Sequence, residues 1–127
     1  AKKFITINVI NAKSLGSAKN IAFSIANSPL FKTAVAGEDP NWGRIVMGIG
    51  KSGEIVDQKK LKIKIGNFIV AENGKISENY DEKKLKEYME WSSIEIEVNL
   101  KLGNDTFKCY TCDFTHDYID INADYRN

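Results

Sequence analysis

The chain has only two cysteines, one histidine and no long apolar run. Two cysteines are too few for a disulfide scaffold, and a lone C-x-x-C pair lacks the second ligand pair that a closed zinc site needs. No apolar stretch approaches the roughly 20 residues of a membrane span. An excess of positive charge is also missing, because 18 Lys and Arg are interspersed with 17 Asp and Glu. We therefore expect neither a membrane nor a nucleic acid as partner.

The 127 residues, 43% of them hydrophobic, are enough for one domain with one core. The start alternates polar and apolar residues and lacks the pattern of a signal peptide, so a cytoplasmic protein is expected. The chain begins at Ala1 without an initiating Met. This suggests that upstream residues are removed or not included, although ordinary Met excision before Ala gives the same start.

The spacing of apolar residues predicts both strands and helices. Alternation and short apolar runs predict strands at residues 4–10, 31–36, 61–65, 68–71, 93–102 and 106–113. Helical spacing and caps predict three helices: from Ser14 or Ser17 to Asn27, from Trp42 to about Lys51 behind an Asn41 cap, and from an Asp81 cap to about Trp91. The last two strands are expected to form a hairpin around residues 103–105. This order indicates an α+β fold, a mixed sheet with hairpins packed by helices on one face.

The two cysteines lie in a run rich in β-forming residues. In a strand, Cys109 and Cys112 are three positions apart and point to opposite faces. This favours a packing role, with a zinc or thiol-redox module as the alternative.

His116 is the only histidine and lies next to Asp117. The pair could form an oriented general base, but adjacent side chains usually point in different directions. A solvated or capping histidine is favoured.

Residues 37–44, with the sequence GEDPNWGR, contain the densest group of polar side chains. Glu38, Asp39, Asn41 and Arg44 meet at an expected loop-to-helix junction beside Trp42. Such a junction can bind an anion, with Arg44 gripping a carboxylate at two points. A buried Arg–carboxylate network that holds the turn against Trp42 would have the same sequence. The residues alone leave both interpretations open.

The last ten residues mix apolar anchors with Asn122, whose amide can both donate and accept a hydrogen bond. Such a group suits recognition of an amino acid, although edge structure explains the pattern at least as well.

Several stretches closely resemble the ornithine acetyltransferase family, whose bifunctional members are also N-acetylglutamate synthases of arginine biosynthesis. The strongest are residues 25–30, 32–45, 111–115 and 121–126, and further likeness lies in residues 4–7, 80–82 and 94–96. These stretches span the chain in the family's order.

The resemblance implies an enzyme that cleaves itself before a threonine, which then carries acetyl from N-acetylornithine to glutamate. Acetyl-CoA is a possible second donor, and no cofactor is implied. Residues 1–127 resemble one C-terminal domain of the resulting β chain, and the nucleophile belongs upstream of Ala1. The expected partners are the rest of the same precursor, in an α2β2 heterotetramer, and the fragment alone is expected to be inactive.

Two substrate-binding positions of the family fall in this chain. Asn122 matches the family's Asn, whereas Asn127 stands where Ser or Thr is usual, so its contact is altered or made through the terminal carboxylate. The resemblance supports the importance of Glu38, Asp39 and Arg44 without assigning them a contact. The alternative to an acetyltransferase part is a free-standing module that binds amino acids.

Overall fold

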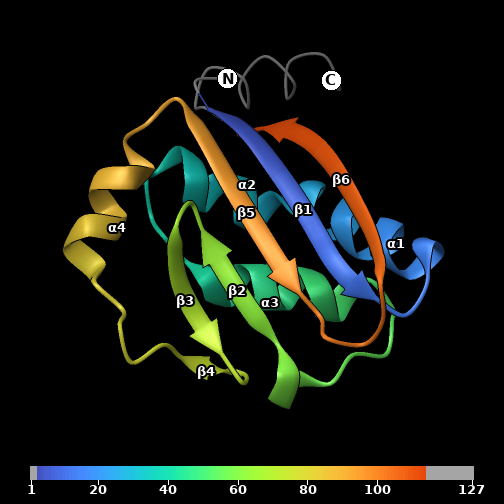
Figure 1. Ribbon diagram of the computed structural model, residues 1–127. Helices are drawn as coiled ribbons and strands as arrows, with labels where there is room; N and C mark the ends of the chain where they lie inside the picture. Colours follow the sequence, from blue (N-terminus) through green and yellow to red (C-terminus); the bar gives the residue numbers. More distant parts are fainter. Residues whose placement is uncertain (1–2, 114–127) are drawn as a thin grey trace, which may run out of the picture.

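The computed structural model describes residues 3–113, which fold into a six-stranded sheet packed with helices (Figure 1). The strands are β1 (Phe4–Ala12), β2 (Lys62–Ile65), β3 (Phe68–Glu72), β4 (Lys75–Ile76), β5 (Ser93–Asn99) and β6 (Asp105–Cys112). The helices are α1 (Leu15–Ala26), α2 (Pro29–Ala36), α3 (Trp42–Lys51) and α4 (Glu82–Met89), with the 3₁₀ turn η1 (Gln58–Lys60) before β2. None of these helices is long and apolar enough to cross a membrane.

The sheet order is β4-β3-β2-β5-β1-β6, so β1 lies between β5 and β6 (Figure 1). It is parallel to β5 and antiparallel to β6. The predicted hairpin between residues 93–102 and 106–113 is therefore wrong. The connection passes around the end of β1, where the backbone N–H groups of Leu102 and Gly103 donate to the Asn11 carbonyl at 2.8 and 2.9 Å. Strand β1 thereby gains a hydrogen-bonded neighbour on each side.

The predicted strand at residues 31–36 is also wrong, because these residues belong to helix α2. The Ser28 side chain accepts a hydrogen bond from the Phe31 N–H at 3.3 Å, and Pro29 occupies the first helical turn. Phe31, Ala34 and Val35 then point into the core at helical spacing. The residues that end α1 therefore also begin α2.

The other three helices are confirmed, with changes at their ends. Ser14 caps α1, and Asn41 and Asp81 cap α3 and α4. Helix α4 ends at Met89, before the predicted Trp91.

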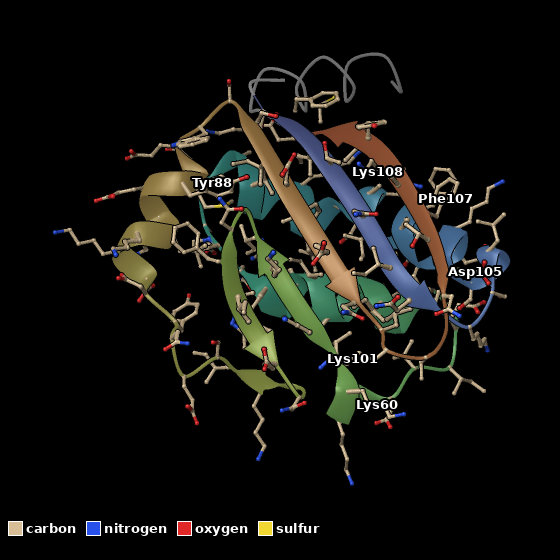
Figure 2. The ribbon with its side chains drawn as sticks, viewed as in Figure 1. Lys60, Tyr88, Lys101, Asp105, Phe107 and Lys108 are labelled. Carbon is tan, nitrogen blue, oxygen red and sulfur yellow. The ribbon has the colours of Figure 1, made fainter. Side chains whose placement is uncertain are left out.

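The core lies between the sheet and helices α1, α2 and α3, which cover one face (Figure 1). Ile5, Ile7 and Val9 of β1 are fully buried on this face, and β5 and β2 contribute residues in the same alternation. The opposite face is partly exposed and mostly polar, with Thr6 and Asn8 of β1 half-buried and the aromatic ring of Phe4 exposed on it. Asn8 of β1 lies there opposite Lys108 of β6, which is labelled in Figure 2.

Helix α4 is joined to the sheet through Tyr88, also labelled in Figure 2. Its hydroxyl accepts a hydrogen bond from the Glu95 N–H of β5 at 2.9 Å. Glu95 directly precedes Ile96, the residue of β5 that forms the last pair with β2. The ring lies against Gly66, which has a φ of +59°. A Cβ at Gly66 would lie 2.6 Å from the Tyr88 ring, so the contact requires glycine.

We expect Gly66→Ala to lower the free energy of unfolding by about 2 kcal/mol or more, combining left-handed strain with the clash against Tyr88. Gly53→Ala is the matched control, because Gly53 has a φ of +78° and no atom near its missing Cβ. Gly53→Ala should lower the free energy of unfolding only by the cost of the left-handed backbone, about 1 kcal/mol. Urea unfolding measures both, and equal losses would show that the Tyr88 contact does not constrain Gly66.

Candidate functional site

The Lys3 side chain lies at the start of β1 and is 7% exposed. Its ammonium donates to the Glu38 carboxylate, the Met89 carbonyl and the Trp91 carbonyl, each at 2.8 Å. Three donors thus meet three acceptors, which is the condition for burying an ammonium group without an unpaired N–H. Because Met89 is the last residue of α4, the charge also lies at the negative end of that helix.

The backbone of Lys3 pairs with Asp113, which directly follows β6. The Lys3 N–H donates to Asp113 Oδ1 at 2.8 Å, and the Asp113 N–H donates to the Lys3 carbonyl at 3.2 Å. Asp113 is 2% exposed. One residue therefore connects the loop after α2, the end of α4 and the end of β6.

The loop between α2 and α3 contains residues 37–41, and its polar groups point in different directions. Glu38 contacts Lys3, whereas Asp39 accepts a hydrogen bond from the Asn41 side chain at 3.5 Å. The side-chain oxygen of Asn41 accepts the Arg44 N–H at 3.3 Å and caps α3. The negative charge of Asp39 also reaches Tyr80, whose pKa is raised by burial first and then by Glu82 and Asp39.

Arg44 donates from Nη1 to the Leu30 carbonyl in the first turn of α2 at 2.7 Å. Within residues 3–113 it forms no ion pair with a carboxylate; the ion pairs there are Lys3–Glu38, Lys62–Glu72 and Lys86–Glu82. The proposed Arg–carboxylate network is therefore absent from this part of the chain. Arg44 instead joins α3 to α2.

Cys109 is buried on the helix side of β6, and Cys112 is exposed. Their opposite orientation is confirmed by the register, in which Ile7 faces Cys109 and Phe4 faces Cys112. Burial raises the pKa of the Cys109 thiol, which disfavours the thiolate needed for metal binding or redox exchange. Among residues 3–113 no group of three or more His, Cys, Asp or Glu side chains could hold a metal ion.

A cavity of about 590 Å³ lies between α4 and the β2–β3 turn. It is lined by Gly66, Asn67, Phe68, Lys84, Glu87, Tyr88, Trp91, Ser93 and Glu95. The sequence singled out none of these side chains as a candidate site residue.

Asn122, Asn127 and His116 lie outside the described residues, so their predicted roles stay predictions. Their segment begins directly after Asp113, at the end of the sheet where Lys3 contacts Glu38.

The sequence prediction missed Lys3 and Asp113. A signal for Lys3 existed, because it continues the alternation of Ile5, Ile7 and Val9 and so faces the helices. A lysine at such a position needs acceptors. The distant carbonyls of Met89 and Trp91 could not be identified from sequence spacing.

The sequence profile of the ArgJ family matches residues 1–127. The chain is 51% identical over all 127 residues to the arginine biosynthesis bifunctional protein ArgJ of Gluconobacter oxydans and spans 30% of that relative. It is 51% identical to the protein of the same name from Ruegeria pomeroyi and spans 31% of it. The chain thus spans about a third of the length of the curated relatives that it matches.

A crystal structure of the arginine biosynthesis bifunctional protein ArgJ from Bacillus halodurans has the same fold. The match has a TM-score of 0.92 at 38% identity and covers 98% of this chain and 59% of that chain.

We expect Lys3→Met to lower the free energy of unfolding by about 2–3 kcal/mol, since it leaves two carbonyls and a carboxylate without their charged donor. Glu38 is 44% exposed and stays hydrated, which limits the loss. Lys86→Met is the control, because its ion pair with Glu82 is exposed and is worth at most about 0.5 kcal/mol. Urea unfolding of the chain measures both, and a Lys3 variant as stable as the Lys86 variant would contradict this account.

Proposed function

The chain belongs to the ArgJ family, and from this membership we propose that it is the C-terminal part of an acetyltransferase of arginine biosynthesis. The enzyme moves acetyl from N-acetylornithine to glutamate. The observation that carries the proposal is the family match over all 127 residues, together with 51% identity to relatives named as arginine biosynthesis proteins.

The proposed reaction has two steps that use one threonine upstream of Ala1. The threonine hydroxyl attacks the carbonyl carbon of the acetyl group in N-acetylornithine. The bond between this carbon and the ornithine nitrogen breaks, and ornithine leaves with the hydroxyl proton on its amine. The glutamate amine then attacks the threonine ester, forming N-acetylglutamate and restoring the hydroxyl. Neither step needs an oxidant, a reductant or a metal, and the residues of this chain serve binding and positioning.

Within this enzyme the chain supplies scaffold and one side of the substrate pocket. Asn122 is proposed to bind the ammonium or carboxylate group of the substrate. Asn127 is proposed to contribute to the same site, at the position where other members of the family have Ser or Thr. The Lys3 contacts support this proposal, because they fix Asp113, the residue from which the chain continues toward Asn122.

The rest of the same precursor is the proposed partner, in an α2β2 assembly located in the cytoplasm. The sheet face opposite the helices supports such a partner. Within residues 3–113 the Asn8 side-chain oxygen is buried without a hydrogen-bond partner. Phe4 and Tyr110 on the same face stack at 5.6 Å while 51% and 60% exposed. Exposed aromatic rings beside an unpaired acceptor are typical of a surface that another part of a protein covers.

We expect Asn122→Ala in the full-length protein to raise the KM for N-acetylornithine about ten- to hundredfold, the effect of losing a hydrogen bond to a charged group. Acetyl transfer to glutamate, from N-acetylornithine and separately from acetyl-CoA, is the assay. Asn104→Ala, in the exposed connection between β5 and β6, is the control and should leave KM unchanged. An unmutated full-length protein that transfers no acetyl would refute the proposed function.

The alternative is a free-standing module that binds amino acids, and it makes a different prediction for the isolated 127-residue chain. The acetyltransferase proposal predicts no measurable heat of binding when millimolar ornithine or N-acetylornithine is titrated into this chain, since most of the pocket is upstream. Saturable binding that Asn122→Ala abolishes would favour the module.

A further inference from the structure

Three aromatic side chains line the cavity between α4 and the β2–β3 turn, and they contact one another. The centre of the Tyr88 ring lies 6.2 Å from that of Phe68 and 5.2 Å from that of Trp91. Tyr88, labelled in Figure 2, is half-buried, whereas Trp91 is 62% exposed. A cavity of about 590 Å³ with an aromatic wall has the size and the lining that are typical of small-molecule sites.

Backbone and hydroxyl contacts hold two of these rings in place. The Trp91 N–H donates to the Tyr88 carbonyl at 3.0 Å, and the Trp91 carbonyl accepts a hydrogen bond from the buried Lys3 ammonium at 2.8 Å. The Tyr88 hydroxyl is held by the Glu95 N–H. The aromatic wall is therefore formed before any ligand arrives, which lowers the entropic cost of binding.

The charged residues of the cavity are two carboxylates, Glu87 and Glu95, and one ammonium, Lys84. Within residues 3–113 neither carboxylate forms an ion pair. Burial raises the pKa of Tyr88, the hydrogen bond from the Glu95 N–H lowers it, and the charge of the Glu95 carboxylate raises it further. Aromatic rings beside an excess of negative charge are the combination that binds cations.

We propose that this cavity binds a small molecule with a guanidinium group and a carboxylate, the chemistry of free arginine. The guanidinium lies against Trp91 and pairs with Glu95, and the carboxylate pairs with Lys84. A guanidinium suits this wall better than an ammonium, because it is planar, stacks on aromatic faces, is less strongly hydrated and grips a carboxylate at two points. The inference goes beyond acetyl transfer and does not depend on it.

Calorimetric titration of the 127-residue chain with L-arginine tests the proposal. We expect saturable binding of one ligand per chain, with half-saturation below about 1 mM. L-Citrulline has the shape of arginine without its charge and should bind at least about tenfold more weakly. L-Ornithine should also bind at least about tenfold more weakly, because its ammonium keeps more of its hydration and cannot stack. An absence of saturable binding, or equal affinity for arginine and citrulline, would overturn the proposal.

Two variants and a matched control locate the binding. Glu95→Gln and Trp91→Ala should each weaken arginine binding about tenfold, the loss of a charge-assisted hydrogen bond or of a cation–aromatic contact. Glu90→Gln is the control, because Glu90 is an exposed carboxylate at the end of the same helix that does not line the cavity. It should bind arginine like the unmutated chain. Equal affinities in Glu95→Gln and Glu90→Gln would contradict the assignment of the ligand to this cavity.

The same titration of the full-length protein shows whether the ligand is free to enter. Binding that Glu95→Gln weakens and Glu90→Gln does not is the expected result. Binding by the 127-residue chain that is lost in the full-length protein would mean that the rest of the precursor fills the cavity. That result would overturn the proposal of a free ligand.

Discussion

A buried ammonium group must find an acceptor for each of its protons, and the arrangement of one end of this fold follows from that requirement at Lys3. The three acceptors are the Glu38 carboxylate and the carbonyls of Met89 and Trp91, which come from two distant parts of the chain. Helix α4 must end where its last carbonyl reaches the ammonium. The loop after α2 must bring a carboxylate to the same place, and it does so at the expense of left-handed backbone at Glu38.

The same residue also fixes the end of β6. Lys3 directly precedes strand β1, which lies between β5 and the edge strand β6, and it holds Asp113 through hydrogen bonds of its own backbone. The last described residue is therefore fixed at the start of β1. The segment with Asn122 follows from there. On the opposite face of the sheet, the Asn8 side-chain oxygen has no hydrogen-bond partner among the described residues and the Phe4–Tyr110 stack is exposed. Both features fit a chain that spans about a third of the length of its relatives.

Local signals in the sequence predicted most elements, and the failures have physical causes. Caps at Ser14, Asn41 and Asp81 were identifiable because a capping side chain acts within three residues. The run at residues 31–36 was mistaken for a strand because a short apolar run fits both a strand and a buried helix. The insertion of β1 between β5 and β6 is a long-range choice that no local pattern contains. Of the candidate site, the importance of residues 38–44 was expected, while the Lys3 contacts were not.

In the proposed function, a threonine upstream of Ala1 carries the acetyl group and this chain contributes scaffold and substrate binding. Mass spectrometry of the full-length protein, quenched during turnover with N-acetylornithine, tests this division most directly. The account predicts one acetyl group on a threonine of a peptide upstream of Ala1 and none on residues 1–127. An acetyl group on any side chain within residues 1–127 that forms and disappears at the rate of turnover would contradict it.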